Sequence, residues 1–226
     1  PGTTFPPINF INLLLVDDRD GDGLRDLVIV QSGGLDARRL AARFHWVSSS
    51  SGTLLRTGYA PDGKECYSLP LFEARPEATS RFYIGTGGES LSGNLIKVGY
   101  PSLEEEWRVR AIGGGFIGSP LLTDLDFDGT DEVLAAGMDG SVYRVDADSG
   151  DVAWRWRDRP YWTYVSPAVG SFNGDETLDV VAGFNRGVWP RRDEARLDWL
   201  DGATGTLLSE HVFDEPGRAT ASSPLV

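Results

Sequence analysis

The feature that most constrains this sequence is a pattern of strands and turns that repeats along the chain. Prolines at positions 70, 120, 167 and 224 mark equivalent points of successive copies and lie 50, 47 and 57 residues apart. Each copy consists of short apolar runs separated by Gly-rich turns, which indicates β-strands and leaves little room for a helix. A period of about 50 residues is the size of one propeller blade. We therefore predict an all-β chain that forms a β-propeller.

The copies also predict where the blades begin and end. We expect about four visible blades of four antiparallel strands, in one partial domain (residues 1–226) of a larger propeller with seven or eight blades. A blade buries both faces against its neighbours, so we expect further blades or a neighbouring chain at the Val226 end. The predicted blades cover residues 10–58, 66–110, 117–160 and 164–218, and residues 221–226 begin another.

Two loops between the first and second apolar runs carry alternating carboxylates. Residues 18–26 read DRDGDGLRD and residues 124–132 read DLDFDGTDE, with acids at positions 1, 3, 5 and 9 and Gly at position 6. Alternate side chains of a tight loop can converge, Gly permits the positive φ that closes it, and the carbonyl of position 7 is free to coordinate. Such loops attract a hard cation. An EF-hand is rejected, because position 12 is Ile29 or Ala135 and strands flank both loops.

These loops, with Phe116-Ile117-Gly118-Ser119-Pro120 before the second, resemble FG-GAP (VCBS-type) repeats, the blades of integrin α-subunit propellers and of many secreted bacterial proteins. Residues 146–154 (DADSGDVAW) resemble the blade endings of quinoprotein-like propellers. The resemblance covers nearly the whole chain and implies Ca²⁺ as the cofactor. Leu24 and Thr130 would contribute backbone oxygens, and Glu132 replaces the usual Asp with a longer reach. The implied side-chain ligands are Asp18, Asp20, Asp22, Asp26, Asp124, Asp126, Asp128 and Glu132.

A third loop, residues 171–179, lacks the first carboxylate and the Gly at position 6. It either binds a cation weakly or merely keeps the shape of the other loops. Residues 74–80 occupy the same place in the second copy without any Asp, so we expect no metal there. The plain alternative for all these loops is an ordinary solvated turn. The weak ligand candidates are Ser171, Asn173, Asp175 and Asp179.

Charge and composition narrow the function. The chain holds 21 basic and 34 acidic residues, a net charge of −13, which repels nucleic acid and anionic membranes. No apolar run reaches the roughly 20 residues of a membrane-spanning helix. Cys66 is the sole cysteine. Together with His45 and His211 it gives too few nitrogen and sulfur ligands for a zinc or copper site. No catalytic constellation is visible, so we expect no enzyme.

Two further patterns have competing interpretations. The run Gly113–Gly118 matches the dinucleotide-binding consensus, but Ser119 and Pro120 followed by a strand argue against the helix that such a site needs. The aromatic cluster predicts either packing between blades or a rim that binds sugar or protein. Its members are Trp154, Trp156, Tyr161, Trp162 and Tyr164. A separate prediction is that residues 189–192 (WPRR) belong to a loop insertion that contacts a partner.

The sequence as a whole predicts a calcium-binding extracellular FG-GAP propeller that acts as an adhesion module and binds protein or glycan through its blade loops. The first alternative is a structural subunit of a large extracellular or membrane-associated assembly. The second is a quinoprotein-like dehydrogenase domain. Low-affinity calcium sites suit compartments rich in Ca²⁺, so we expect an exported protein: extracellular, at the cell surface or periplasmic.

Overall fold

The computed structural model describes residues 11–33, 41–76, 79–89, 91–157, 160–187 and 193–213. These residues form four antiparallel sheets of four strands each, which we call blades 1 to 4 in chain order. Blade 1 contains β1 (Ile11–Leu15), β2 (Leu27–Gln31), β3 (Arg43–Val47) and β4 (Leu54–Tyr59). Blade 2 contains β5 (Leu71–Glu73), β6 (Arg81–Gly85), β7 (Asn94–Gly99) and β8 (Glu105–Arg110).

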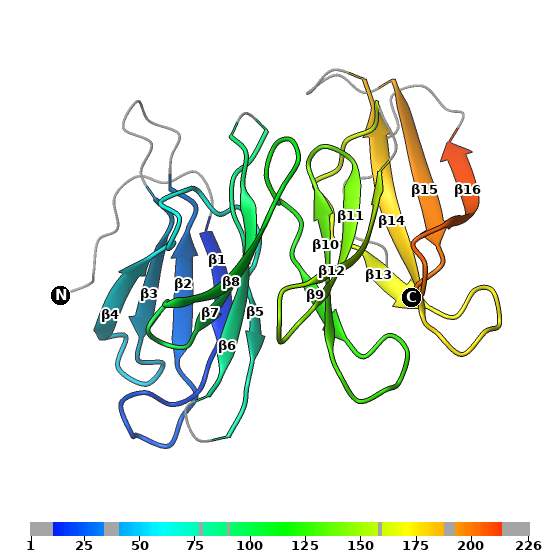
Figure 1. Cartoon of the computed structure of the whole chain (residues 1–226). Helices are drawn as coiled ribbons and strands as arrows, with labels where there is room; N and C mark the ends of the chain where they lie inside the picture. Colours follow the sequence, from blue (N-terminus) through cyan, green and yellow to red (C-terminus); the bar gives the residue numbers. More distant parts are fainter. Residues whose placement is uncertain are drawn as a thin grey trace.

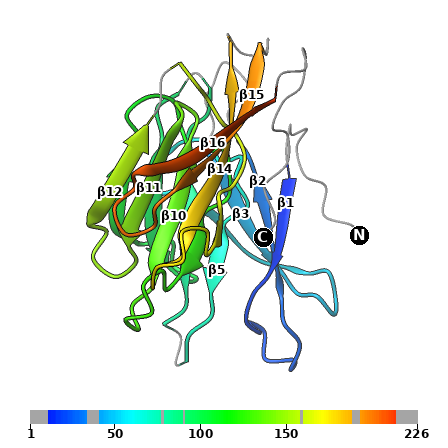
Figure 2. The ribbon, with the colours of Figure 1, turned by 90° about the vertical axis from the view of Figure 1, so that its right-hand side faces the viewer.

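Blade 3 contains β9 (Leu121–Thr123), β10 (Glu132–Gly137), β11 (Ser141–Asp146) and β12 (Val152–Arg157). Blade 4 contains β13 (Ala168–Gly170), β14 (Asp179–Arg186), β15 (Glu194–Leu200) and β16 (Leu207–Phe213). In every blade each strand pairs with the next along the chain, so the blade is a simple meander; β10, β11 and β12 lie side by side in Figure 2. The part of the chain that the structure describes contains no helix, and hence none that could cross a membrane.

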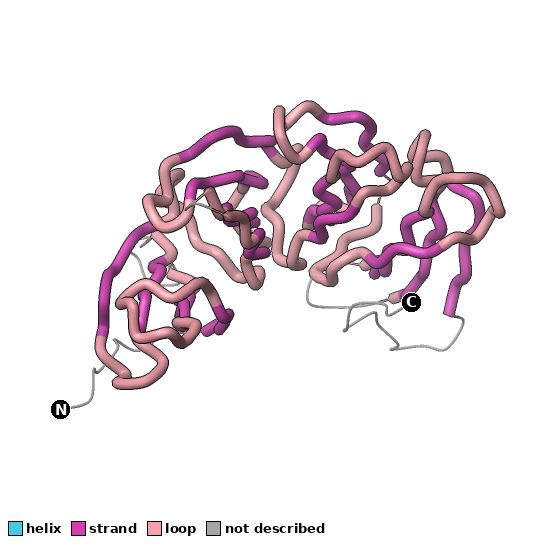
Figure 3. The backbone as a smooth tube through the Cα atoms, turned by 90° about the horizontal axis from the view of Figure 1, so that it is seen from below, coloured by secondary structure: helices cyan, strands magenta, loops and turns pink. Residues whose placement is uncertain are grey.

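The four blades stand next to one another along the chain (Figure 1) and follow an arc when seen from below (Figure 3). The predicted all-β propeller architecture, with four blades of four antiparallel strands, is confirmed. A ring of seven or eight blades stays a prediction. Residues 189–192 and 221–226, for which an insertion and a further blade are predicted, lie outside the described residues.

Three separate cores lie between the blades. Successive side chains of a strand point to opposite faces, so one strand serves two neighbours. In β6, Phe82 and Ile84 pack in the core shared with blade 1, whereas Tyr83 packs in the core shared with blade 3. This double burial explains why the central strands are apolar throughout rather than alternating: β10 is buried along its whole length.

The hairpins between the third and fourth strands share one design. Gly52, Gly150 and Gly205 adopt φ of 68°, 80° and 71°, a conformation that side chains disfavour, and each closes a tight turn. The Gly amide donates to the carbonyl four residues earlier, for example Gly150 N to Asp146 O at 3.0 Å. In blade 2, Leu103 takes the same place with φ of 61°.

The glycine-rich run before β9 leads into a strand, as Ser119 and Pro120 indicate. Its glycines allow the backbones of adjacent blades to approach closely. A Cβ on Gly115 would lie 2.3 Å from the carbonyl carbon of Gly87, and one on Gly118 would lie 2.4 Å from Val165 O. The match to a dinucleotide consensus therefore reflects packing between blades.

Candidate metal centres

The three acidic loops occupy equivalent places in blades 1, 3 and 4. Each joins the first strand of its blade to the second, and the loops lie at the lower end of the blades in Figure 1. At each loop, three carboxylates offer oxygen atoms that all lie within 4.8 Å of one another, and in blade 4 one of them comes from a neighbouring turn. The three groups are Asp18, Asp20 and Asp22; Asp124, Asp126 and Glu132; and Asp175, Asp179 and Asp201.

In blade 1 the convergence follows from the local backbone. Asp18 Oδ1 accepts the Gly21 amide at 2.7 Å and Oδ2 accepts the Gly23 amide at 2.8 Å. The amides of Gly23 and Gly21 lower the pKa of Asp18, which keeps the carboxylate charged. Both glycines adopt positive φ, which turns the loop tightly enough to bring Asp18, Asp20 and Asp22 together on the exposed side.

Asp26, the predicted ligand at position 9, lies apart from this exposed group. It is fully buried, and its carboxylate accepts the amides of Arg19 at 2.8 Å and Ser49 at 3.2 Å. It therefore fastens the loop to the β3–β4 turn of the same blade. The amide of Leu24 donates to Asp22 Oδ1 at 2.8 Å. Coordination by Asp26 and by the Leu24 carbonyl stays a prediction.

In blade 3 the group is composed differently. Asp124 accepts the amides of Gly129 at 2.9 Å and Asp128 at 3.1 Å, which closes the loop. Asp128 lies outside the group of three and instead accepts the Thr130 amide at 2.8 Å and the Thr130 hydroxyl. These two bonds lower the pKa of Asp128. Glu132, with its longer side chain, joins Asp124 and Asp126.

Arg144 belongs to the charged groups of the candidate site in blade 3, and the sequence reasoning missed it. It lies on β11, and its Nη2 is 2.6 Å from Asp126 Oδ2 and also contacts Glu132 Oε1. Its Nη1 donates to Gly202 O of blade 4 at 3.1 Å. Burial lowers the pKa of Arg144, but the bonds to Glu132 and Asp126 outweigh it and the net shift is upward. A permanent guanidinium charge thus lies among the carboxylates of this loop.

Blade 1 has no arginine at the corresponding place. In blade 3, Arg144 pairs with Leu134, which lies two residues after Glu132. In blade 1, Val28 lies two residues after Asp26, and the residue that pairs with it is Trp46. The sequence signal for this difference is the single basic residue in the otherwise apolar stretch of β11.

In blade 4 the third carboxylate comes from another turn. Asp201 lies in the β15–β16 turn, and Asn173 Nδ2 bridges Asp201 Oδ2 at 3.1 Å and Asp175 Oδ2 at 2.7 Å. Asp179 is fully buried and accepts the Phe172 amide at 2.8 Å. Asp201 was also missed, although the turn DGATG repeats the spacing of DADSG in blade 3. Ligation by Ser171 stays a prediction.

Blade 2 has a serine hydroxyl where the equivalent loops have an acid. Ser80 takes the place of the acid at position 9, and its hydroxyl donates to Asp17 Oδ2 of blade 1 at 2.9 Å. The same hydroxyl accepts the Arg75 amide at 3.0 Å. This loop therefore contributes a contact between blades 1 and 2.

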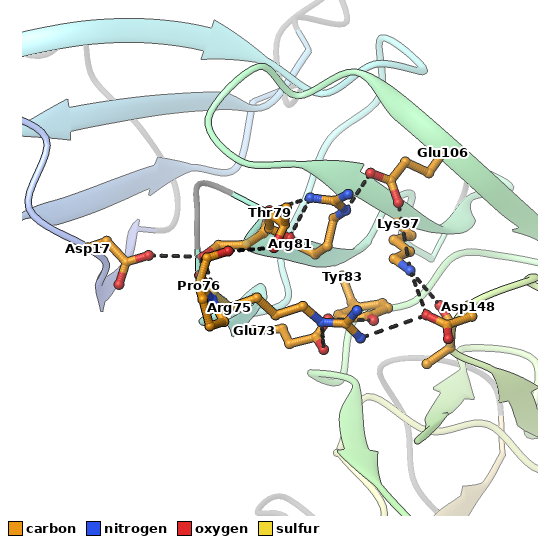
Figure 4. Close-up of polar contacts among 12 residues, drawn as sticks. Asp17, Glu73, Arg75, Pro76, Thr79, Arg81, Tyr83, Lys97, Glu106 and Asp148 are labelled. Carbon is orange, nitrogen blue, oxygen red and sulfur yellow. Dashed lines mark hydrogen bonds and ion pairs between the residues drawn. The ribbon is translucent and has the colours of Figure 1, made fainter. Parts of the chain in front are cut away.

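Tryptophans also join neighbouring blades at the end where the acidic loops lie. Trp107 Nε1 of β8 donates to Ala147 O at 3.0 Å, and Lys97 Nζ of β7 donates to the same carbonyl at 2.9 Å. Figure 4 shows Lys97 also directed toward Asp148. Trp154 repeats the arrangement one blade later, with Nε1 2.8 Å from Gly202 O. The packing interpretation of Trp154 is therefore confirmed.

Comparisons with known proteins find one family model and several solved structures that are similar to this chain. The family model described as the Lambda-carrageenase beta-propeller domain matches residues 89–184, less than half of the chain. A search of curated proteins finds no match. The solved structure of BamB from Moraxella catarrhalis is similar at 14% identity and TM-score 0.49, over 91% of this chain and 52% of that one.

Two other solved structures are similar to a comparable degree. BBS1N in complex with ARL6DN gives 14% identity and TM-score 0.48, over 91% of this chain and 51% of that one. The quinohemoprotein alcohol dehydrogenase ADHIIG from Pseudomonas putida HK5 gives 15% identity and TM-score 0.48, over 78% of this chain and 34% of that one. The chain spans about half the length of the first two structures. It is a β-propeller domain; the FG-GAP type stays a prediction.

Proposed function

We propose that this chain is an exported, calcium-binding propeller module of the FG-GAP type that binds a protein or glycan partner without catalysing a reaction. The observation that carries the proposal is the recurrence of three converging carboxylates at the same place in three blades. Like charges within a few ångströms repel one another, and a divalent cation with oxygen ligands relieves that repulsion. Calcium then holds the acidic loop of each of these three blades in shape.

The three loops differ in how strongly they need the ion. The blade 1 group consists of three exposed aspartates, and the blade 4 group is completed by Asp201. In blade 3, Arg144 already supplies a positive charge to Asp126 and Glu132. We therefore assign the tighter sites to blades 1 and 4, and a weaker site to blade 3 where calcium competes with the guanidinium.

Calcium binding is tested by removing the ion. We expect the melting temperature of the metal-free chain to rise with millimolar CaCl₂ and to rise less with MgCl₂, because Mg²⁺ dehydrates reluctantly and demands near-octahedral geometry. Replacing Asp18, Asp20 and Asp22 by Asn should remove one binding event in titration calorimetry. Asp151→Asn, at an exposed residue outside the three groups, is the matched control. A melting temperature that ignores calcium contradicts the proposal.

The glycan arm of the proposal is supported by the family model, which is named for a carrageenase. It is tested by affinity electrophoresis of the calcium-loaded chain in gels with and without λ-carrageenan. Retardation that disappears with chelator supports a glycan partner held through the calcium loops. Unchanged mobility would contradict the glycan partner and favour a protein partner.

The structural-subunit alternative is favoured by one specific feature, the exposed apolar residues on β1. The dehydrogenase alternative rests on the DADSGDVAW ending, and every distinctive residue of that ending has a packing role. Ala147 accepts the Trp107 indole, Gly150 lies beneath it, and Trp154 reaches the next blade. We therefore place the dehydrogenase last.

A further inference from the structure

We propose that Asn173 is a site of spontaneous deamidation, in which the backbone nitrogen of Gly174 attacks the side-chain amide and water completes its conversion to a carboxylate. The modification falls in the loop between β13 and β14 of blade 4, and its co-reactant is water. The observation that carries it is the state of the glycine amide that follows each Asp or Asn of this chain.

The reaction needs a backbone nitrogen that is free to attack. The Gly174 nitrogen gives its proton to solvent base and bonds to Cγ of Asn173, while Nδ2 takes up a proton and leaves as ammonia. Water then attacks either carbonyl carbon of the cyclic succinimide and the bond from that carbon to nitrogen breaks. The product at position 173 is aspartate or isoaspartate, and the overall change converts an amide and a water molecule into a carboxylate and an ammonium ion.

The Gly174 amide differs from the others of its kind because it is free. In all six Asp–Gly pairs of the sequence the glycine amide donates a hydrogen bond. Within the part of the chain that the structure describes, the amide of Gly174 has no such partner. The held amides are those of Gly21, Gly23, Gly129 and Gly202, which donate to Asp carboxylates, and those of Gly63 and Gly140, which donate to backbone carbonyls.

The first residue of the loop explains the free amide. In blade 1, Asp18 at position 1 accepts the amide of Gly21 at position 4, at 2.7 Å. Blade 4 has Ser171 at position 1 and Gly174 at position 4. Asn173 and Gly174 are both exposed, and a Cβ on Gly174 would meet no atom of the described residues within 4 Å. Neighbouring groups therefore leave room for the ring to close.

The contacts of the Asn173 side chain favour both attack and departure. Its Oδ1 accepts the Asp175 amide at 2.9 Å, which stabilises the negative charge that develops on this oxygen during attack. Its Nδ2 donates to Asp175 Oδ2 at 2.7 Å and to Asp201 Oδ2 at 3.1 Å. These two carboxylates stabilise the nitrogen as it gains a proton and leaves.

Deamidation changes the charge of the candidate metal centre in blade 4. A neutral donor between Asp175 and Asp201 becomes a carboxylate at the loop position that Asp20 occupies in blade 1. The added negative charge increases the repulsion within the group. The modified loop therefore binds calcium more tightly, a consequence that rests on the proposed function, whereas the reaction itself does not.

The test compares two Asn–Gly pairs that the fold holds differently. Asp20→Asn creates the tripeptide Asn-Gly-Asp at the same loop positions in blade 1, where the Gly21 amide is held by Asp18. The variant is incubated in mildly alkaline buffer with chelator, and mass spectrometry quantifies deamidation at positions 20 and 173. The hydrogen bond must break before the nitrogen attacks, so position 20 should react about tenfold more slowly than Asn173. In denaturant the two positions should react at similar rates.

A second variant tests the cause from the other side. Ser171→Asp should hold the Gly174 amide as Asp18 holds that of Gly21, and slow the reaction of Asn173 about tenfold. Asn94, which is buried in β7, should stay intact and serves as the internal reference. Equal rates at positions 20 and 173 in the folded chain, or an Asn173 that reacts only in denaturant, would overturn the proposal.

The calcium consequence is measured separately, so that it can fail without the reaction. Asn173→Asp carries the aspartate product from the start and should bind calcium in blade 4 about tenfold more tightly in titration calorimetry. Its melting temperature in chelator should lie below that of the original chain, because the bridge between Asp175 and Asp201 is lost. An unchanged affinity would overturn the calcium consequence, and because deamidation is followed in chelator, its rates do not depend on calcium binding.

Discussion

At the scale of single residues, the acidic loops are distinguished by the cations that the fold brings to them. Arg144 lies 18 residues after Asp126 in the sequence, yet its guanidinium bonds to that carboxylate and to Glu132. A buried charged group of this kind is costly unless it is paired. We therefore expect loops that look nearly identical in sequence to differ in their affinity for calcium.

Replacing Arg144 by Gln should strengthen calcium binding in blade 3. Without the positive charge, Asp126 and Glu132 repel each other and attract a divalent ion, so we expect the affinity of this loop to rise about tenfold. In chelator the variant should melt below the original chain, because the buried carboxylate of Glu132 and the exposed carboxylate of Asp126 lose their partner. Titration calorimetry measures the affinity, with Arg155→Gln, at an exposed residue of β12, as the control. An unchanged affinity would show that Arg144 does not compete with the ion.

Cys66 should be unreactive in the folded chain. The thiol is fully buried in the core between blades 1 and 2, and burial raises its pKa to about 12. The thiolate is the reactive form, so alkylation of Cys66 by iodoacetamide should be slow. Its rate should not rise between pH 8 and 10, whereas the rate for an exposed thiol would. Mass spectrometry in the presence and absence of denaturant measures this. Rapid labelling without denaturant would mean that these two blades separate readily.

At the scale of strands and turns, the hairpins between third and fourth strands join each blade to the one before it. The same five-residue turn closes its own hairpin through a glycine amide and accepts an indole from the preceding blade. One short turn therefore stabilises both the hairpin within its blade and the contact with the preceding blade. This double use explains why the turn retains glycine where Asn would also tolerate positive φ.

Gly150→Ala and Gly205→Ala should destabilise the chain more than Gly63→Ala. All three substitutions force a side chain into positive φ, which costs about 1–2 kcal/mol. At Gly150 and Gly205 the new methyl group also overlaps an indole, which adds about 1–3 kcal/mol of overpacking. Urea unfolding followed by circular dichroism gives the free energies of unfolding. Equal losses for the three variants would refute the proposed role of the indole contact.

At the scale of the whole molecule, the arc of four blades presents two unlike ends. Blade 1 offers a glycine turn and an apolar first strand, whereas the outward face of blade 4 carries a third-strand tryptophan. Packing in a propeller is a contact between neighbours only, so each junction is specified by its own pair of faces.

The blades and the first two loops could be predicted from the sequence because their signals are local. Apolar runs of strand length, the glycine turns and the DxDxDG spacing each lie within about ten residues of chain, and meander pairing follows chain order. The same local reading gave the first two acidic loops one shared ligand set, which stays a prediction. In the structure, Asp128 bonds to Thr130 and lies outside the group that Asp124, Asp126 and Glu132 form.

The tertiary structure alone decided what lies opposite each loop and each turn. Asp201 and Arg144 come from later strands and turns, and the partners of Gly150 and Gly205 come from neighbouring blades. Such contacts depend on how sheets stack and twist, and no local spacing encodes that arrangement. The sequence by itself therefore determined the repeating blade and its acidic loops, whereas the packing of blade upon blade decided which carboxylates meet a cation and where an indole can bind.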